Sequence, residues 1–191
     1  RSALAASQTE SVTLSREFTQ LRAYLDIMAL RMGPRLSYRL DLPAAATRRT
    51  PALLVLVADG FAAADDALSA WIGKALASGD FKTEAGRLMT SFGAPGLAAE
   101  RLVLVGIGDG HPARVRKAVA AGVAALRAGA ASAVTVCFAQ QPQAVYAATL
   151  ALVEAAYSYP TTKSRPDPEE KGAALKNAWI GGASAAAARR A

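Results

Sequence analysis

Residues 77–109 read ASGDFKTEAGRLMTSFGAPGLAAERLVLVGIGD, and they are the most informative part of the sequence. It contains two apolar runs typical of β-strands, 86–92 and 101–105, which are separated by a turn and followed by a glycine-rich loop. Upstream, residues 52–57 are apolar throughout, as in a strand that is buried on both faces of a sheet. Residues 36–42 instead alternate apolar and polar side chains, and they predict a half-exposed strand. These segments predict the first part of a β-sheet.

Helical periodicity alternates with the strands through the middle of the chain. Apolar residues recur at helical spacing in three places, namely Leu68, Trp71, Ile72 and Leu76; Val115, Val119, Val123 and Leu126; and Val145, Tyr146 and Leu152. We expect Trp71 in the core, Pro112 at the first position of the second helix and Pro142 at the start of the third. A strand at 132–138 separates the last two helices, and residues 175–191 have room for one short strand and a helical tail. The alternation predicts an α/β domain with three layers and a mixed sheet.

The order of turn, strand, turn, strand and glycine loop resembles the N-terminal domain of the M17 leucyl aminopeptidase family. The resemblance rests on a Gly-Asp-Phe segment, a following glycine, a Pro-Gly turn, an Arg-led strand and a Gly-x-Gly end, which are Gly79, Asp80, Phe81, Gly86, Pro95, Gly96, Arg101, Gly106 and Gly108. It continues through Tyr157, Lys163 and Ser164, and it covers roughly residues 36–168. Because that family's N-terminal domain is similar to a macro domain, the resemblance implies a macro-like three-layer α/β fold.

Residues 83–88 (TEAGRL) superficially match the catalytic signature of the same family, Asn-Thr-Asp-Ala-Glu-Gly-Arg-Leu. The match fails because the Asp is absent, the Glu and Ala are exchanged, and the single asparagine of the chain is Asn177. In the family, the acids of that signature bind two divalent metal ions in a C-terminal catalytic domain. The resemblance therefore implies no catalytic residue, cofactor or metal site in this chain, and the two metal ions would belong to a missing catalytic domain.

The glycine-rich loop is a weak candidate site for an anion. Gly106, Gly108 and Gly110 lie between a strand and the start of a helix, where exposed backbone amides can hold phosphate. The third glycine is not at the offset that a dinucleotide fingerprint requires, and the alternative is a tight turn whose glycines permit unusual backbone angles. His111 and Asp109 could form a proton-transfer pair, but no Ser or Cys nucleophile is visibly linked to them, so we expect a solvated histidine.

Charge and composition narrow the classes of partner. The net charge is +7, and residues 1–50 hold eight Lys or Arg against four acids, whereas residues 51–150 hold eight against seven. We do not expect nucleic acid as a partner, because binding it needs clustered cations on the folded domain. No apolar run approaches the roughly 20 residues that cross a bilayer, so no transmembrane segment is expected. Cys137, the single cysteine, lies in an apolar run and predicts a small core residue.

The N-terminal region has the pattern of an amphipathic helix that begins near Ser11 and ends at Gly33 and Pro34. The apolar stripe of this helix consists of Leu14, Phe18, Leu21, Leu25, Met28 and Met32. The stripe either packs on the chain's own domain or binds another protein subunit, because an exposed stripe would be a liability in a free monomer. The second alternative predicts a homo- or hetero-oligomer.

We expect an N-terminal extension at 1–35, an M17 N-terminal-like α/β domain at 36–160, and a linker and C-terminal tail at 161–191. The expected function is that of a noncatalytic structural or interaction subunit of a larger assembly. One alternative is a fragment of a complete metal-dependent leucyl aminopeptidase whose C-terminal catalytic domain is missing, and another is a macro-like module that binds ADP-ribose or nucleic acid. The basic N-terminal region and the first residue, Arg1, resemble a processed organellar protein and predict a mitochondrial location, with the cytoplasm as the alternative.

Overall fold

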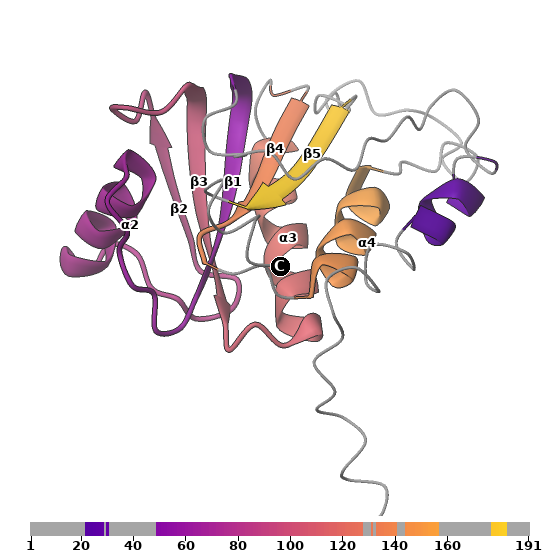
Figure 1. The fold of residues 1–191 in the computed structure, drawn as a ribbon, viewed down its shortest axis with the longest axis horizontal. Coiled ribbons are helices and arrows are strands. Elements are labelled where there is room, and N and C mark those ends of the chain that lie inside the picture. Colours follow the sequence, from indigo (N-terminus) through magenta and orange to yellow (C-terminus); the bar gives the residue numbers. More distant parts are fainter. Residues whose placement is uncertain are drawn as a thin grey trace, which may run out of the picture.

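A mixed five-stranded sheet lies at the centre of the structure (Figure 1). This computed structural model describes residues 22–28, 30, 49–127, 131, 133–140, 144–156 and 177–182. The strands are β1 (Thr50–Ala58), β2 (Leu88–Phe92), β3 (Ala99–Gly108), β4 (Ala133–Phe138) and β5 (Asn177–Gly182). Their order is β2-β3-β1-β4-β5, in which β2 is antiparallel to β3 and the other neighbouring strands are parallel. The predicted α/β class with a mixed sheet is therefore confirmed.

The central strands are those with the longest apolar runs. β1 pairs with β3 on one side and with β4 on the other, and nearly every residue of these three strands is buried. A strand covered on both faces needs apolar side chains at consecutive positions, which is why ALLVLV at 52–57 lies in the middle of the sheet. β2 alternates exposed and half-buried residues, as expected at an edge.

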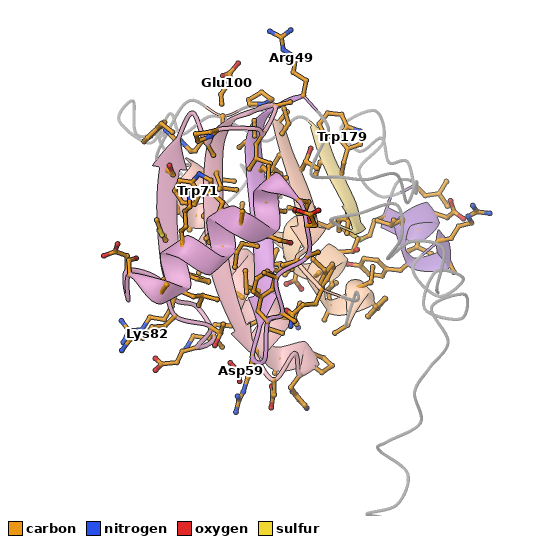
Figure 2. All side chains as sticks on the ribbon, turned by 60° about the vertical axis from the view of Figure 1, so that its left-hand side comes forward. Arg49, Asp59, Trp71, Lys82, Glu100 and Trp179 are labelled. Carbon is orange, nitrogen blue, oxygen red and sulfur yellow. The ribbon has the colours of Figure 1, made fainter. Side chains whose placement is uncertain are left out.

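Helices cover both faces of the sheet. Helix α2 (Ala67–Ala77) lies across one face, and α3 (Pro112–Arg127) and α4 (Val145–Ala156) lie on the other (Figures 1 and 2). Pro112 is the first residue of α3, as predicted, because a proline there gives up no helical hydrogen bond. The carboxylate of Asp66 caps α2 by accepting the Ser69 N–H at 2.8 Å. No helix in the described part of the chain is long and apolar enough to span a membrane.

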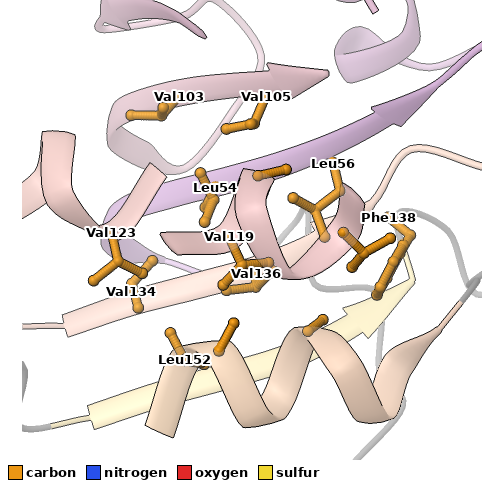
Figure 3. Packing of buried hydrophobic residues seen from close by; sticks show 14 of the residues in the cluster. Leu54, Leu56, Val103, Val105, Val119, Val123, Val134, Val136, Phe138 and Leu152 are labelled. Carbon is orange, nitrogen blue, oxygen red and sulfur yellow. The ribbon is translucent and has the colours of Figure 1, made fainter. Parts of the chain in front are cut away.

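Two apolar clusters hold the three layers together, one on each face of the sheet. Leu53, Val55 and Val57 of β1 point to the side of α2, whereas Leu54 and Leu56 point to α3 and α4. Figure 3 shows the second cluster, in which Leu54, Leu56, Val103, Val105, Val119, Val123, Val134, Val136, Phe138 and Leu152 meet. Trp71 is only partly buried and packs at the margin of the α2 cluster, so it is less central than predicted.

Segments from both ends of the chain join this domain. β5 pairs with β4 from Asn177 to Gly182, so the sheet extends beyond the expected domain boundary at residue 160. At the other end, residues 22–28 are helical, and Leu25 is buried among the residues that face α3 and α4. The predicted strand at 36–42 and the helical tail expected near the C-terminus lie outside the described residues.

Candidate functional site

The carboxyl ends of β1 and β4 form the position at which open α/β sheets usually bind ligands. The chain leaves β1 toward α2 on one face and leaves β4 toward α4 on the other, so the connections diverge between these two neighbouring strands. The side chain of Gln140, which follows β4, reaches the end of β1 at this point. Its Oε1 accepts the Ala58 N–H at 2.9 Å, and its Nε2 donates to the Asp59 carbonyl at 3.4 Å. The side-chain amide of Gln140 thus forms hydrogen bonds with the backbone at the end of β1.

The loop before β2 lies directly against β3. Gly86 N–H donates to the Gly106 carbonyl at 2.9 Å, and Gly106 N–H donates to the Arg87 carbonyl at 2.9 Å. A Cβ on Gly106 would overlap the carbonyl oxygens of Thr83 and Glu84. Gly106 is therefore required by the close approach of two backbones, a reason different from the tight turn that the sequence offered as the alternative.

The other two glycines of the predicted anion loop are also engaged within the protein. Gly108 N–H donates to the Thr83 carbonyl at 2.7 Å, and Gly110 N–H donates to the Ile107 carbonyl at 3.1 Å. Both residues have positive φ angles, 59° for Gly108 and 76° for Gly110. The amides of Gly106, Gly108 and Gly110 thus all donate to carbonyl groups of this chain.

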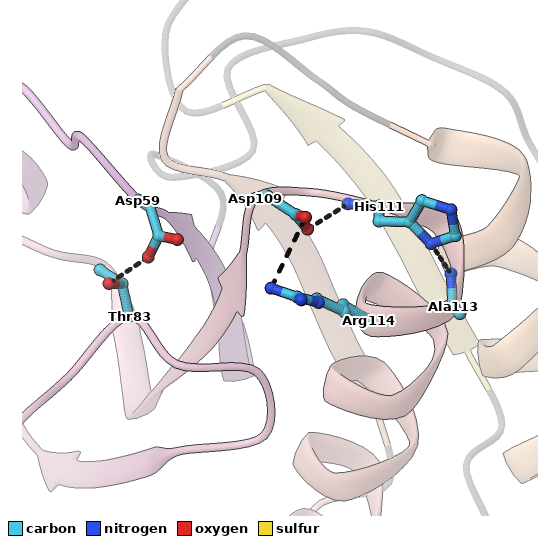
Figure 4. A network of polar contacts seen from close by, with 6 residues as sticks. All are labelled: Asp59, Thr83, Asp109, His111, Ala113 and Arg114. Atoms are coloured by element: carbon cyan, nitrogen blue, oxygen red, sulfur yellow. Dashed lines mark hydrogen bonds and ion pairs between the residues drawn. The ribbon is translucent and has the colours of Figure 1, made fainter. Parts of the chain in front are cut away.

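The N-terminus of α3 is capped by its own preceding residues (Figure 4). Asp109 Oδ1 accepts the His111 N–H at 3.0 Å, and His111 Nδ1 accepts the Ala113 N–H at 3.3 Å. The second oxygen of Asp109 lies 3.5 Å from Arg114 Nη1. A carboxylate near a helix N-terminus is favoured electrostatically, and Asp109 is placed there by its bonds to His111 and Arg114. His111 contributes to the same cap, and within the described residues no nucleophile is bonded to its side chain.

A second polar contact ties β1 to the loop before β2. Asp59 Oδ1 accepts the Thr83 hydroxyl at 2.5 Å (Figure 4), and Asp59 N–H donates to the Gly108 carbonyl at 2.7 Å. The carboxyl ends of β1 and β3 are therefore joined by backbone and side-chain hydrogen bonds. Sequence reasoning missed Thr83 and Gln140, because each bonds to residues far away along the chain.

Cys137 is a buried core residue, as predicted from the sequence. Burial, followed by the charge of Asp66, raises the pKa of the Cys137 thiol from 9.0 to about 12. Since the thiolate is the nucleophilic form, the geometry does not favour covalent chemistry at this sulfur. The nearby Thr135 hydroxyl on β4 is buried and has no hydrogen-bond partner within the described residues.

The predicted partner stripe is described in part. Leu25 is 2% exposed within the core cluster, Met28 is partly buried against the same cluster, and Tyr24 meets Tyr146 of α4 edge-on with ring centroids 5.9 Å apart. These residues pack on the chain's own domain. Leu14, Phe18, Leu21 and Met32 lie outside the described residues, so a partner role for the stripe as a whole stays a prediction.

Comparison with known proteins agrees with this architecture. Residues 54–166 match the family model described as "Cytosol aminopeptidase family, N-terminal domain". A probable cytosol aminopeptidase of Polaromonas naphthalenivorans strain CJ2 is 43% identical over 123 residues, which are 62% of this chain and 24% of that protein. The corresponding protein of Variovorax paradoxus strain S110 is 38% identical over 150 residues, which are 78% of this chain and 29% of that protein. The chain thus spans about a quarter of the length of these curated relatives.

Solved structures give the same fold at low sequence identity. A mutant of tomato leucine aminopeptidase superposes with a TM-score of 0.55 and 17% identity, covering 83% of this chain and 37% of that one. A Trypanosoma brucei macrodomain in complex with ADP-ribose superposes with a TM-score of 0.54 and 13% identity, covering 95% of this chain and 90% of that one. The predicted macro-like fold is confirmed. Because the family match takes in more than half of the residues, this chain belongs to the cytosol aminopeptidase family and contains its N-terminal domain.

Proposed function

We propose that this chain is a noncatalytic domain that makes structural contacts within a larger aminopeptidase-type assembly. The observation that carries the proposal is the set of contacts at the carboxyl ends of the strands. There Gln140 bonds to the end of β1, His111 Nδ1 accepts the Ala113 N–H at the start of α3, and the loop before β2 covers Gly106. Groups that bind ligands in other α/β domains are used here to hold the domain together.

The dinuclear metal site that the family implies does not fit the described residues. Within residues 22–28, 30, 49–127, 131, 133–140, 144–156 and 177–182, no three His, Cys, Asp or Glu side chains lie close enough together to hold a metal ion. Asp59 and Asp109 are bonded to Thr83 and Arg114 instead. We therefore assign no step of peptide hydrolysis to these residues.

An activity assay tests the noncatalytic role. The purified chain is incubated with leucine p-nitroanilide and with Mn²⁺ or Zn²⁺, and the full-length Polaromonas naphthalenivorans relative serves as the active control. We expect no metal-dependent release of nitroaniline by the chain. Release that is abolished by a chelator would contradict the proposal.

The structural role requires a second measurement, because absence of activity alone does not demonstrate it. The relative's chain, truncated to remove the region that this chain matches, is mixed with the purified chain, and the two are separated by size-exclusion chromatography. We expect co-elution, since the domain would supply the contacts that the truncated protein lacks. Separate elution at micromolar concentrations would refute a structural role of this kind.

The same pair of proteins addresses the alternative that the chain is a fragment of a complete leucyl aminopeptidase. That alternative is supported by relatives about four times as long as the matched region. It predicts that co-elution restores the peptidase activity or the stability of the truncated relative. A subunit retained for interactions alone would bind without restoring either property.

Binding of ADP-ribose is less well supported, although one structural neighbour is a macrodomain in complex with that ligand. The likeness is one of fold, and the glycine amides of the candidate loop are bonded to Thr83, Arg87 and Ile107 carbonyls. Titration calorimetry with ADP-ribose, and with a DNA duplex at low and high salt, separates these alternatives from the structural role. Saturable heat with either ligand would favour the binding module.

A further inference from the structure

β2 is one of the two edge strands of the described sheet, and alternate residues of β2 direct their backbone N–H and C=O groups away from β3. In an antiparallel pair, alternate residues direct their N–H and C=O groups toward the partner strand. Gly106 N–H donates to the Arg87 carbonyl and Gly93 N–H donates to the Glu100 carbonyl, so the odd-numbered residues of this segment face β3. Leu88, Thr90 and Phe92 therefore direct their backbone groups outward. Within the described residues no strand pairs with that edge.

The side chains of the same three residues lie on one face of the sheet. Leu88 and Thr90 are paired with Val105 and Val103 of β3, whose side chains point to the layer of α3 and α4. At the edge this face is uncovered, since Leu88 is 39% and Phe92 is 69% exposed. The Arg101 guanidinium lies over the Phe92 ring, 4.8 Å from its centroid. β2 thus combines unpaired backbone with exposed apolar side chains.

Within its five residues, the strand also lacks three of the features that protect free edges. Edge strands usually have a charged residue, a proline or a bulge that opposes pairing with another chain. The sequence of β2, LMTSF, contains no charge and no proline, and its pairing with β3 is regular over all five residues.

We propose that β2 pairs antiparallel with β2 of a second copy of this chain, around a two-fold axis that passes between the two Thr90 residues. This register places Leu88 opposite Phe92 of the second copy at both ends and Thr90 opposite Thr90 in the middle. The three residues with outward backbone groups are then the three that exchange hydrogen bonds. Each exposed apolar side chain of β2 meets an apolar side chain of the other copy on the same face.

The distribution of charge is compatible with a second copy. Arg87 would lie opposite Gly93, so the two Arg87 residues are at opposite ends of the paired strands. Each Arg87 also keeps its own partner, because its Nε lies 3.3 Å from Glu84 Oε2. No like charges meet along the paired edge. The inference names a contact surface for the structural role proposed above and rests on that role, but its test measures association of two copies and not catalysis.

Cysteine substitution tests the register directly. Residues directly opposite in a hydrogen-bonded antiparallel pair have Cα atoms about 5.5 Å apart, within the range of about 4.4–6.8 Å that a disulfide spans. We expect Thr90→Cys to form a disulfide-linked dimer as the main species on a non-reducing gel. Phe92→Cys is the matched control, since this more exposed position would lie several residues from its symmetry mate and should remain largely monomeric. The native Cys137 is buried and does not compete.

A charge-exchange pair tests the same contact without a covalent link. Leu88→Lys with Phe92→Lys places Lys opposite Lys, whereas Leu88→Lys with Phe92→Glu places Lys opposite Glu. In sedimentation equilibrium we expect the first variant to weaken dimerisation by about tenfold or more and the second to restore it. Equal melting curves establish that both variants fold. A wild-type chain that stays monomeric, equal cross-linking at positions 90 and 92, or no recovery with the Lys–Glu variant would overturn the proposal.

Discussion

Gly106 on β3 lies in direct contact with the backbone of Glu84, so that no side chain can be placed between them. The contact exists because the loop before β2 bonds to both sides of Gly106, through the Gly86 amide and the Arg87 carbonyl. This loop therefore cannot move outward without the loss of hydrogen bonds at the end of β3.

Replacement of Gly106 tests the contact. We expect Gly106→Ala to lower the free energy of unfolding by about 3 kcal/mol, because a methyl group overlaps backbone carbonyls that cannot rotate away. Gly73→Ala in α2 is the matched control, since its Cβ would meet no atom within 4 Å. That change should stabilise the protein by about 0.5–1 kcal/mol through helix propensity. Urea unfolding of both variants measures the difference, and equal stabilities would contradict the close contact.

The Arg116–Glu154 pair joins α3 to α4, with Arg116 Nη2 at 2.7 and 2.8 Å from the two carboxylate oxygens. Both side chains are about half exposed, so solvent screens their attraction. We expect a double-mutant cycle with Arg116→Ala and Glu154→Ala to give a coupling free energy below about 1 kcal/mol. The coupling should decrease further as salt is added. A larger, salt-independent coupling would indicate that the pair is shielded from solvent.

Cys137 predicts a pH dependence of stability. Its thiol has a pKa of about 12 in the folded chain, against 9.0 without burial. Between these values the native state holds the proton and the unfolded state releases it, so stability is fully present below pH 9.0 and falls as the pH rises toward 12. Chemical unfolding of the wild type and of Cys137→Ala, at neutral pH and above pH 9.0, isolates this contribution from the titration of Tyr and Lys. The difference between the two proteins should shrink with rising pH, and a constant difference would be inconsistent with it.

The parts of the fold that depend on local patterns could be predicted from the sequence. β1 and β3 follow from continuous apolar runs, and α3 follows from Pro112 and the spacing of Val115 and Val119. Strand β2 was expected from residue 86 but begins at Leu88, since Gly86 has a φ of 88°, which a regular strand does not allow.

The hydrogen bonds of the candidate site could not be predicted in the same way, because they join residues that are distant in the sequence. Gln140 bonds to Ala58, which is 82 positions away, and Thr83 bonds to Asp59 across the sheet. The glycines of the loop are compatible with a tight turn or with an anion site, and local sequence does not distinguish these. In the structure, the loop before β2 supplies the Thr83 and Arg87 carbonyls that accept the Gly108 and Gly106 amides, and these contacts involve residues about 20 positions apart.

The helical segment at 22–28 gives the last prediction, on whether the N-terminal region belongs to the domain. Leu25 is 2% exposed, and the neighbouring Tyr24 meets Tyr146 of α4. We expect Leu25→Ala to lower the free energy of unfolding by about 2–3 kcal/mol, because it leaves a cavity between this segment and the core. Leu30→Ala is the matched control, as Leu30 is 87% exposed and its removal should change stability by less than about 0.5 kcal/mol.

Deletion of residues 1–33 extends the same test to the whole region. If Leu25 holds the segment against α4, the shortened protein should melt at a lower temperature. Its unfolding transition should also be less cooperative, because the same contact is lost. If the shortened protein has an unchanged melting temperature but no longer binds a partner that binds the full chain, the apolar stripe would be a binding surface for another subunit. Equal stability of the Leu25 and Leu30 variants would lead to the same conclusion, since a side chain buried in the domain's own core must contribute more to folding than an exposed one.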